Sequence, residues 1–267
     1  MYKFAVFGNP IHHSLSPYIQ NQFAKQTGFE ISYDKILAPV DDFVSPVQAF
    51  INQGGNGFNI TMPFKLDAFK FANELTLNAK IAGSVNTIKI EADKIFGENT
   101  DGIGLIKDLT HNIGIKLKNK IILILGAGGA TQGILFPILK QGPNQVIISN
   151  RTHSKAIRLA KNFSKFGNTC SISLNKIKHE SIDIIINATS ASLDGKIPNI
   201  AFNVANNTIC YDLMYGYQTP FMDWAKTNHA KMISDGLGML VEQAAIAFEF
   251  WTGTKPDTKK VLSNLRR

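Results

Sequence analysis

The sequence predicts an α/β protein of two domains, of which the second is a doubly wound parallel sheet. Over residues 1–100, strand-like and helix-like segments alternate, which indicates helices layered on a sheet. From Lys120 onward the strands become nearly continuous apolar runs, such as IILIL, the pattern of parallel strands covered on both faces. A chain of 267 residues is long enough to build two cores of this kind.

The expected elements follow in chain order. In the first part we expect strands in YKFAVFG, ISYDKIL and GFNIT and a hairpin over residues 84–97, with helices that begin near Pro17, Asp41 and Lys65. Residues 103–114 are expected to form a connecting helix. The second part has strands in KIILILG, QVIIS, CSISL, IDIIIN, TICYDL and KMIS, and a long last helix that ends at Gly253.

Composition narrows the class of protein. Its 44% apolar and 18% charged residues are typical of a globular chain. The opening MYKFAVFG is too short for a signal peptide, and no apolar run reaches the length of a membrane span, so we expect a cytoplasmic protein. Cys170 and Cys210 lack the spacing of a disulfide framework or a metal site, and we expect no metal. The net charge of +8 is spread along the chain without the aromatic interleaving of a nucleic-acid binder. It indicates an ordinary solvated basic surface or, as the functional alternative, a field that attracts small anions.

A glycine turn predicts a dinucleotide site. In ILILGAGGATQG, an apolar strand leads into glycines and then a helix, an arrangement that presents backbone amides to a pyrophosphate. Gly126 and Gly128 fit the first two places of the GxGxxG fingerprint, whereas Thr131 occupies the third, so the strict pattern fails.

The end of the next strand predicts which dinucleotide binds. An NAD site usually has an acidic residue here for the ribose hydroxyl, but this chain has Asn150, Arg151 and Thr152, followed by Lys155. Arg151 suits a 2′-phosphate, although a mere helix-start arginine is the alternative. We therefore expect NADP(H) rather than NAD(H).

A lysine and an aspartate are the candidate catalytic pair. Lys65 stands in the first turn of a helix, where a cation is disfavoured, so it is either a surface lysine or one retained for proton transfer. Asp101, in GENTDG, is either a helix N-cap or the group that orients the lysine. Asn59 and Thr61 are two apart in a strand and so project to one face.

Two hydroxyls precede the first helix. Ser16 is expected as its N-cap and Pro17 as its first helical residue, an assignment that leaves Ser14 unexplained. A pair of hydroxyls beside a helix N-terminus suits a carboxylate ligand. Asn86, in SVNT, supplies a further amide in the same domain.

These residues lie in motifs that resemble the shikimate dehydrogenase family, the NADP-dependent enzymes of aromatic amino-acid biosynthesis. The ordered motifs, which together span nearly the whole chain, are VFGNPIHHSLSP, GFNITMPFK, AGSVNT, GENTDG, GAGGA, NRT, NATS, YDLMY and DGLGMLVEQA. The resemblance implies reduction of 3-dehydroshikimate to shikimate in a cleft between a substrate-binding domain, residues 1–102 plus 238–267, and a Rossmann-like NADP-binding domain, residues 103–237.

The resemblance also assigns residue roles. It implies that Lys65 and Asp101 are catalytic and that Ser14 and Ser16 bind the substrate carboxylate. The implied ligands of the ring hydroxyls are Asn59, Thr61, Asn86, Tyr215 and Gln243, together with the catalytic pair. The implied cofactor-binding residues are Gly126, Ala127, Gly128, Gly129, Ala130, Asn150, Arg151, Thr152, Lys155, Thr189, Ser190, Met214, Gly236 and Met239.

Two positions depart from the family pattern, and several alternatives stay open. Ser192 stands where glycine is frequent, and Leu77 where an acidic residue is frequent. The alternatives are a quinate/shikimate dehydrogenase of the same fold, a non-catalytic sensor of NADPH or shikimate and, third, a nucleic-acid binder. No membrane partner is expected, and the sequence leaves open whether the protein is a monomer or a homodimer.

Overall fold

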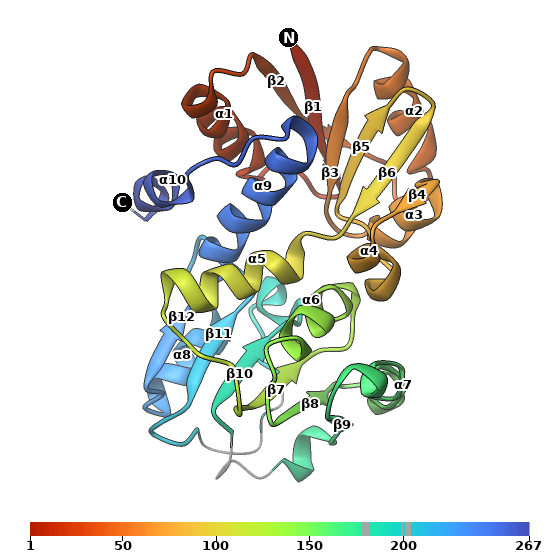
Figure 1. Cartoon of the computed structure of the whole chain (residues 1–267). Coiled ribbons are helices and arrows are strands. Elements are labelled where there is room, and N and C mark those ends of the chain that lie inside the picture. Colours follow the sequence, from red (N-terminus) through yellow and green to blue (C-terminus); the bar gives the residue numbers. More distant parts are fainter. Residues whose placement is uncertain (178–181, 199, 201–203, 267) are drawn as a thin grey trace. The chain divides into compact units, whose positions relative to one another are not determined.

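The chain folds into two compact units. The structure is a computed structural model that describes residues 1–177, 182–198, 200 and 204–266 (Figure 1). One unit comprises Met1–Gly104 and Leu240–Arg267, and the other comprises Leu105–Met239. Within the described residues, no helix has both the length and the apolar character needed to cross a membrane.

The first unit is built on a mixed six-stranded sheet in the order β2-β1-β3-β5-β6-β4. Its strands are β1 (Tyr2–Gly8), β2 (Ile31–Leu37), β3 (Gly57–Ile60), β4 (Glu74–Leu75), β5 (Thr87–Glu91) and β6 (Lys94–Glu98). Its helices are α1 (Ser16–Thr27), α2 (Val44–Asn52), α3 (Lys65–Phe71), α4 (Leu77–Ala82), α5 (Asp101–Lys107), α9 (Leu237–Thr252) and α10 (Thr258–Leu265), of which α5 and α9 continue into the other unit. The strands expected in this half are therefore confirmed.

The two faces of this sheet bury different clusters. Phe58 and Ile60 of β3 pack with Phe50 of α2 on one face. Phe4 of β1 packs with Trp251 of α9 on the other. Because successive strand residues point to opposite faces, Asn59 and Thr61 must face the α9 side of the sheet. This alternation turns the polar side chain of Asn59 away from the phenylalanine core.

The second unit is an all-parallel sheet in the order β9-β8-β7-β10-β11-β12. The strands are β7 (Ile121–Leu125), β8 (Gln145–Ser149), β9 (Thr169–Ser171), β10 (Ile184–Asn187), β11 (Ile209–Asp212) and β12 (Met232–Ser234). The helices are α6 (Gly129–Leu139), α7 (His153–Phe163) and α8 (Pro220–Thr227), with a π-helical turn η1 (Asp108–Asn112) and 3-10 turns η2 (Ser164–Phe166), η3 (Leu174–Lys176) and η5 (Ala191–Asp194).

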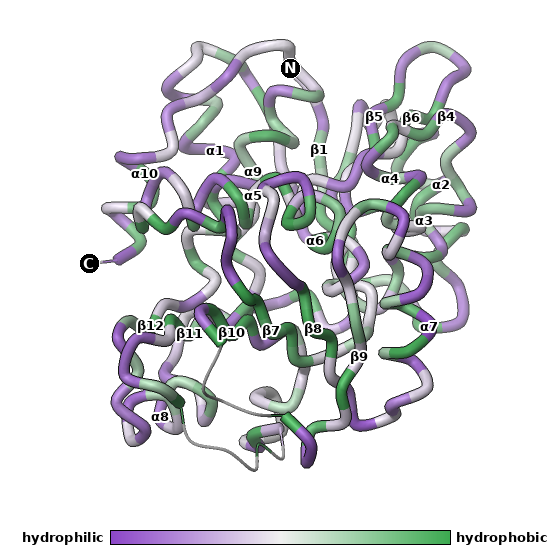
Figure 2. The backbone as a smooth tube through the Cα atoms, turned by 60° about the horizontal axis from the view of Figure 1, so that its bottom comes forward, coloured by the Kyte–Doolittle hydropathy of each residue, from purple (hydrophilic) through white to green (hydrophobic). Residues whose placement is uncertain are grey.

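This strand order is that of a Rossmann domain. Counted from β7, the strands lie in the order 3-2-1-4-5-6, with the reversal between β7 and β10. Leu123 and Ile124 are both fully buried, although they point to opposite faces, which confirms the prediction of a sheet covered on both sides. Figure 2 shows the hydrophobic colouring of β7 and β8, whose sequences are IILIL and QVIIS. Ligands of such sheets bind at the carboxyl ends of the strands beside the reversal.

Several local features differ from those that the sequence predicts. Helix α2 begins at Val44 rather than Asp41, because the Asp42 carboxylate accepts the Ser45 backbone N–H at 3.0 Å and holds the preceding turn. The short strand β4 and the helix α10 were not expected from the apolar spacing. Asp257 caps α10 by accepting the Lys259 N–H.

The start of α1 also differs. Ser16 is its first residue rather than its N-cap, and Leu15 takes the cap position without a side-chain bond. The Ser14 hydroxyl oxygen accepts the Ser16 N–H at 3.3 Å instead. The hydrogen bond at the start of α1 is therefore accepted by Ser14, whose role the expected capping by Ser16 had left unexplained.

Candidate active site

Lys65 is the first residue of α3, as predicted, and the segment just before β5 fixes the position of its backbone. The Lys65 carbonyl accepts the Val85 N–H at 3.0 Å, directly before Asn86 and β5. The side chain of Lys65 is 20% exposed, so it is neither buried nor extended into solvent. The surface-lysine alternative is therefore disfavoured.

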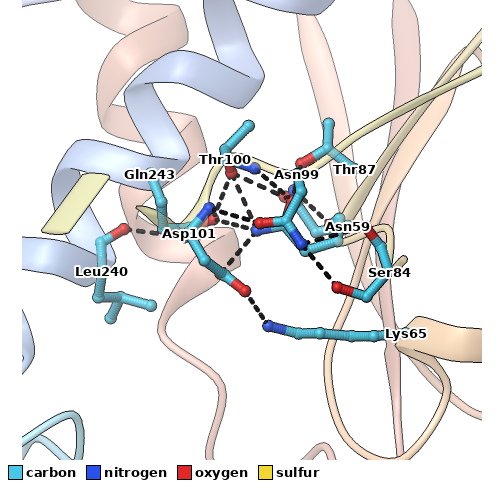
Figure 3. A network of polar contacts seen from close by, with 10 residues as sticks. Asn59, Lys65, Ser84, Thr87, Asn99, Thr100, Asp101, Leu240 and Gln243 are labelled. Atoms are coloured by element: carbon cyan, nitrogen blue, oxygen red, sulfur yellow. Dashed lines mark hydrogen bonds and ion pairs between the residues drawn. The ribbon is translucent and has the colours of Figure 1, made fainter. Parts of the chain in front are cut away.

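The Lys65 ammonium forms an ion pair with the Asp101 carboxylate, whose side chain is 8% exposed (Figure 3). Asp101 is the first residue of α5, yet both of its carboxylate oxygens bond side chains: Oδ2 accepts from Lys65 and Oδ1 from the Asn86 amide at 2.8 Å. The Asp101 N–H itself donates to Asn99 Oδ1 at 3.2 Å. The Asp101 carboxylate thus binds Lys65 and Asn86 and does not cap the helix, which was the alternative.

Asn86 connects several strand and helix ends. Its Oδ1 accepts the Thr100 backbone N–H at 2.9 Å, and its Nδ2 donates to Thr100 Oγ1 at 2.9 Å. Gln243 of α9 lies at the edge of the same group, with its Oε1 at 3.4 Å from Asn86 Nδ2 and 3.2 Å from Thr100 Oγ1. Gln243 Nε2 donates to the Leu240 carbonyl of its own helix at 2.9 Å. The structure therefore brings Lys65, Asp101, Asn86 and Gln243 into one network. Figure 3 shows how Lys65, Asp101 and Gln243 lie in it.

Asn59 faces this network from β3. It is 6% exposed, and its amide is paired within the protein: Oδ1 accepts from the Tyr33 hydroxyl at 2.6 Å, and Nδ2 donates to Thr87 Oγ1 at 3.0 Å and to the Asn86 carbonyl at 3.3 Å. Only one lone pair of Oδ1 is left for a ligand. Thr61, just past the strand, is half-buried, and its backbone N–H pairs with the Phe7 carbonyl.

The two serines lie together at the start of α1. The Ser14 hydroxyl donates to Ser16 Oγ at 3.2 Å, and Ser16 is 7% exposed while Ser14 is half-buried. Burial raises the pKa of Tyr33 well above its usual range, so this phenol stays protonated. The Ser16 side chain also acts on the Tyr33 phenol, whose pKa it lowers by a smaller amount.

In the second unit, the glycine turn between β7 and α6 has the geometry of an anion cradle. Gly126 has a φ of 111°, and a Cβ there would lie 3.0 Å from the Ala188 carbonyl oxygen. A Cβ added at Gly128 or Gly129 would meet nothing within 4 Å, so space is open before the first turn of α6. The adjoining Ala127 and Ala130 are half-buried. A pyrophosphate fits a helix N-terminus of this kind.

Thr131 explains why the strict glycine fingerprint fails. This residue is fully buried, and its hydroxyl donates to the Gly126 carbonyl at 3.0 Å. The hydroxyl thus pins the turn where a third glycine would only allow close helix-to-strand packing. The substitution keeps the shape of the turn by a different contact.

The carboxyl end of β8 carries basic and polar groups. Arg151, Thr152 and Lys155 are exposed around the start of α7, and Asn150 Nδ2 donates to the Thr152 carbonyl at 3.0 Å. Thr152 is the N-cap residue of α7, but within the described residues it makes no side-chain cap bond, so its hydroxyl remains available. This donor set has no carboxylate to repel a phosphate group and one guanidinium to bind it.

A second buried network, which the sequence did not reveal, joins β10 and β11. Asn187 Oδ1 accepts from the Thr189 hydroxyl at 2.8 Å, and Asn187 Nδ2 donates to Asp212 at 3.2 Å. Asp212 also accepts the Thr219 hydroxyl at 2.6 Å and the Met214 N–H at 3.1 Å. Burial raises the pKa of Asp212 above its usual value. This network fixes the backbone at two predicted cofactor positions, Thr189 and Met214; the neighbouring predicted position, Ser190, is exposed.

The start of α9 is held tightly in the second unit. A Cβ at Gly236 would clash with the Leu213 carbonyl oxygen, and the Gly236 N–H donates to the Met214 carbonyl at 2.8 Å. Met214 and Gly236, both predicted to bind the cofactor, are therefore adjacent, and Met239 is buried in the first turn of α9.

A buried carboxylate abuts the same turn of α9. Asp108 accepts the Tyr211 hydroxyl at 2.7 Å, and a Cβ at Gly238 would overlap its Oδ1. Only glycine fits at position 238 against this carboxylate. Tyr215 follows β11 and is half-buried, and burial raises the pKa of its phenol.

The two departures from the family pattern are also placed. Leu77 begins α4 and is 64% exposed, beside the N-cap residue Thr76. Ser192 is 4% exposed, and in the part of the chain that the structure describes its hydroxyl has no hydrogen-bond partner. Neither side chain belongs to the hydrogen-bond networks described above.

Models of one family match three stretches of the chain. They are the shikimate dehydrogenase substrate binding domain over residues 6–88, shikimate / quinate 5-dehydrogenase over residues 108–194 and the shikimate 5'-dehydrogenase C-terminal domain over residues 236–266. Together these matches cover more than half of the chain.

Similar proteins carry the same description. The chain is 92% identical over 267 residues, the full length of both, to the shikimate dehydrogenase (NADP(+)) of Vesicomyosocius okutanii subsp. Calyptogena okutanii (strain HA). It is 77% identical over 266 residues, again the full length of both, to that of Ruthia magnifica subsp. Calyptogena magnifica. Among solved structures, shikimate 5-dehydrogenase from Thermus thermophilus in complex with NADP(H) and shikimate is 31% identical, with a TM-score of 0.88 over 100% of this chain and 99% of that one.

Proposed function

The chain belongs to the shikimate dehydrogenase family, and on that premise we propose that it catalyses the reversible NADPH-dependent reduction of 3-dehydroshikimate to shikimate. The observation that carries this proposal beyond family membership is the partly buried pair of Lys65 and Asp101, held by Asn86. The protein is then an oxidoreductase of aromatic amino-acid biosynthesis.

Lys65 is the proposed proton donor. NADPH, when bound, supplies the hydride that adds to the C3 carbonyl carbon of the substrate. As the carbonyl bond breaks, its oxygen gains negative charge, which the Lys65 ammonium stabilises and then neutralises by transferring a proton. In the reverse direction, neutral Lys65 takes the proton from the hydroxyl. The cost of placing a cation at the start of a helix is thus offset by function.

Asp101 is proposed to orient Lys65 and to accept a hydrogen bond from the substrate hydroxyl. Asn86 supports this role, because its Nδ2 fixes one carboxylate oxygen at 2.8 Å while the other oxygen accepts from the lysine. Gln243 and Thr61 are proposed as further ligands of the ring hydroxyls, and Asn59 through its one remaining lone pair. The Ser14 and Ser16 hydroxyls are proposed to donate to the substrate carboxylate, and Tyr215 is proposed as a ligand from the second unit.

NADP(H) is the cofactor that the second unit suits. The open space before α6, with Gly126, Ala127, Gly128, Gly129 and Ala130, is proposed to receive the pyrophosphate. Asn150, Arg151, Thr152 and Lys155 are proposed to bind the 2′-phosphate. Thr189, Ser190, Met214, Gly236 and Met239 are proposed to line the remaining part of the dinucleotide. We accordingly propose residues 1–102 plus 238–267 as the substrate-binding domain and residues 103–237 as the cofactor-binding domain.

A direct assay tests the proposed reaction. The purified protein is mixed with NADPH and 3-dehydroshikimate, and the loss of NADPH absorbance is followed; the same assay is then run with NADH. Turnover with NADPH and much weaker turnover with NADH supports the proposal. Lack of turnover with either cofactor would leave the sensor alternative, which binding of shikimate without a reaction identifies.

Quinate is the discriminating second substrate. The family description that matches residues 108–194 names both shikimate and quinate, which keeps the broader specificity as a second candidate. Oxidation of quinate at a rate comparable with that of shikimate supports a quinate/shikimate dehydrogenase. A strong preference for shikimate supports the biosynthetic form.

A cytoplasmic location remains part of the proposal. Both cysteines, Cys170 and Cys210, are free thiols, a state that a reducing compartment maintains. The proposed partner is the small-molecule substrate. The protein itself is proposed to be either a monomer or a homodimer.

A further inference from the structure

We infer that Tyr33 is a positioning residue for the reaction proposed above: its hydroxyl begins a one-directional chain of hydrogen bonds that runs through Asn59, Thr87 and Asn86 to the Asp101 carboxylate. The inference rests on the proposed function only for the role of Asp101. The chain itself is a property of the first unit. Tyr33 lies in β2, and nothing in the amino-acid sequence singles it out.

The direction of the chain is fixed at the Asp101 end. An ionised carboxylate only accepts hydrogen bonds, so the Asn86 atom 2.8 Å from Asp101 Oδ1 must be the amide nitrogen. A backbone N–H only donates, so the Asn86 atom 2.9 Å from the Thr100 nitrogen must be the amide oxygen. Both anchors give Asn86 the same orientation.

That orientation determines the next link. Thr87 Oγ1 lies 3.1 Å from Asn86 Oδ1, and since this oxygen can only accept, the Thr87 hydroxyl must direct its single hydrogen there. Towards Asn59 the Thr87 oxygen can then only accept, at 3.0 Å. The Asn59 atom is therefore its amide nitrogen, which also faces the Asn86 carbonyl, a pure acceptor, at 3.3 Å.

The remaining link follows by the same reasoning. Asn59 presents its Oδ1 to Tyr33, so the phenol must donate its only hydrogen, at 2.6 Å. Every donor from Tyr33 to Asn86 points towards the carboxylate, and hydrogen bonds aligned in this way strengthen one another.

Tyr33 is a buried link at the start of the chain. It is 7% exposed, and its ring packs near Trp251, with centroids 6.3 Å apart, in the cluster that contains Phe4. Without the phenolic hydroxyl, Asn59 Oδ1 has no donor from this side, and the Asn59 amide is held only through its Nδ2, by Thr87 Oγ1 at 3.0 Å and the Asn86 carbonyl at 3.3 Å. The later links are then weaker, because aligned hydrogen bonds strengthen one another. The proposed catalytic carboxylate thus loses support through three intermediate side chains.

Tyr33→Phe tests the chain, because it keeps the ring and removes only the hydroxyl. With the wild-type rate established first, we expect kcat to fall about tenfold, the effect of one lost hydrogen bond, while KM for NADPH stays within about a factor of two. Thr27→Val is the matched control, since among the described residues the Thr27 hydroxyl bonds only carbonyls of its own helix, at 2.8 Å to Phe23; its kcat should be that of the wild type.

A second pair of variants keeps the test valid if Tyr33→Phe folds poorly. Thr87→Val removes a hydroxyl at nearly constant shape, and Thr87→Ser keeps the hydroxyl and removes a methyl group. The chain predicts a low kcat for the valine variant and near-normal kcat for the serine variant. In the double variant Tyr33→Phe/Thr87→Val, kcat should fall no further than in the worse single variant, because either change breaks the same chain.

One readout is independent of catalysis. The side-chain amide resonances of Asn86 in nitrogen-15 spectra should move in Tyr33→Phe and stay in place in Thr27→Val. If the wild type fails to reduce 3-dehydroshikimate but these resonances move, the proposed function fails and the chain stands. Unmoved resonances, a normal kcat for Tyr33→Phe or Thr87→Val, or multiplicative losses in the double variant would each overturn the inference.

Discussion

Gly104→Ala is predicted to damage substrate binding by moving one helix. Gly104 lies in α5, and an added Cβ would stand 2.7 Å from Gln243 Cβ, 2.8 Å from its backbone nitrogen and 3.0 Å from its Cα. These are not atoms at the flexible end of a side chain, so rotation of Gln243 cannot relieve the contact. Helix α9 must retreat by about 0.7 Å to restore the ordinary contact distance of 3.4 Å.

The size of the effect follows from two distances. Gln243 Oε1 lies 3.2 Å from Thr100 Oγ1 and 3.4 Å from Asn86 Nδ2, so a retreat of that size takes both contacts beyond hydrogen-bond reach. Overpacking of this kind costs about 1–3 kcal/mol of folding free energy. Misplacement of a proposed substrate ligand by nearly 1 Å should lower kcat/KM for shikimate about tenfold or more.

Thermal unfolding and steady-state kinetics measure the two effects separately. KM for NADPH is the internal control, because the glycine turn at Gly126 belongs to the other unit. A Gly104→Ala protein with unchanged melting temperature and unchanged kcat/KM for shikimate would refute the reasoning. It would mean that the close approach of α5 to α9 does not determine the position of Gln243.

Three further predictions concern single side chains. Arg151→Ala should lower kcat/KM for NADPH about tenfold or more while leaving that for NADH nearly unchanged, since only the former cofactor has the phosphate that the guanidinium is proposed to bind; equal losses with both cofactors would contradict it. Asp101→Asn should reduce turnover by about two orders of magnitude, because the amide no longer balances the Lys65 ammonium; a normal rate would remove the carboxylate from the mechanism. The pKa of Asp212 is raised, so the folded state binds the carboxyl proton more tightly than the unfolded state, and folding stability falls as the pH rises from 3.8 through the raised pKa. Asp212→Asn should reduce this loss of stability with pH, as measured by urea unfolding at several pH values. The same dependence of stability on pH in the variant would contradict the prediction.

The sequence allowed most of the elements and the candidate catalytic pair to be predicted for identifiable reasons. Apolar runs such as IILIL have few competing interpretations, and the Rossmann order follows from right-handed connections between parallel strands. Lys65 was conspicuous because a cation at a helix start needs a reason. The glycines of the turn were conspicuous because a φ of 111°, as at Gly126, strongly favours glycine.

The networks that hold these groups could not be predicted in the same way. Tyr33, Thr87 and Asn187 lie in strands where their spacing is that of ordinary strand residues, and nothing local marks them as hydrogen-bond partners. Their pairing depends on which strands become neighbours, which is a property of the whole sheet. In the sequence Asp212 is simply an acidic residue at the end of a strand. Its hydrogen bonds with Thr219 and Asn187 become visible only in the folded structure.

The central claim is that Lys65 transfers the proton, and the single-turnover rate of Lys65→Ala tests it most directly. With NADPH and 3-dehydroshikimate both saturating, the account predicts a rate about a thousandfold below that of the wild type. Shikimate affinity and melting temperature should change little, since the lysine side chain is only partly buried. A rate close to that of the wild type would contradict the account.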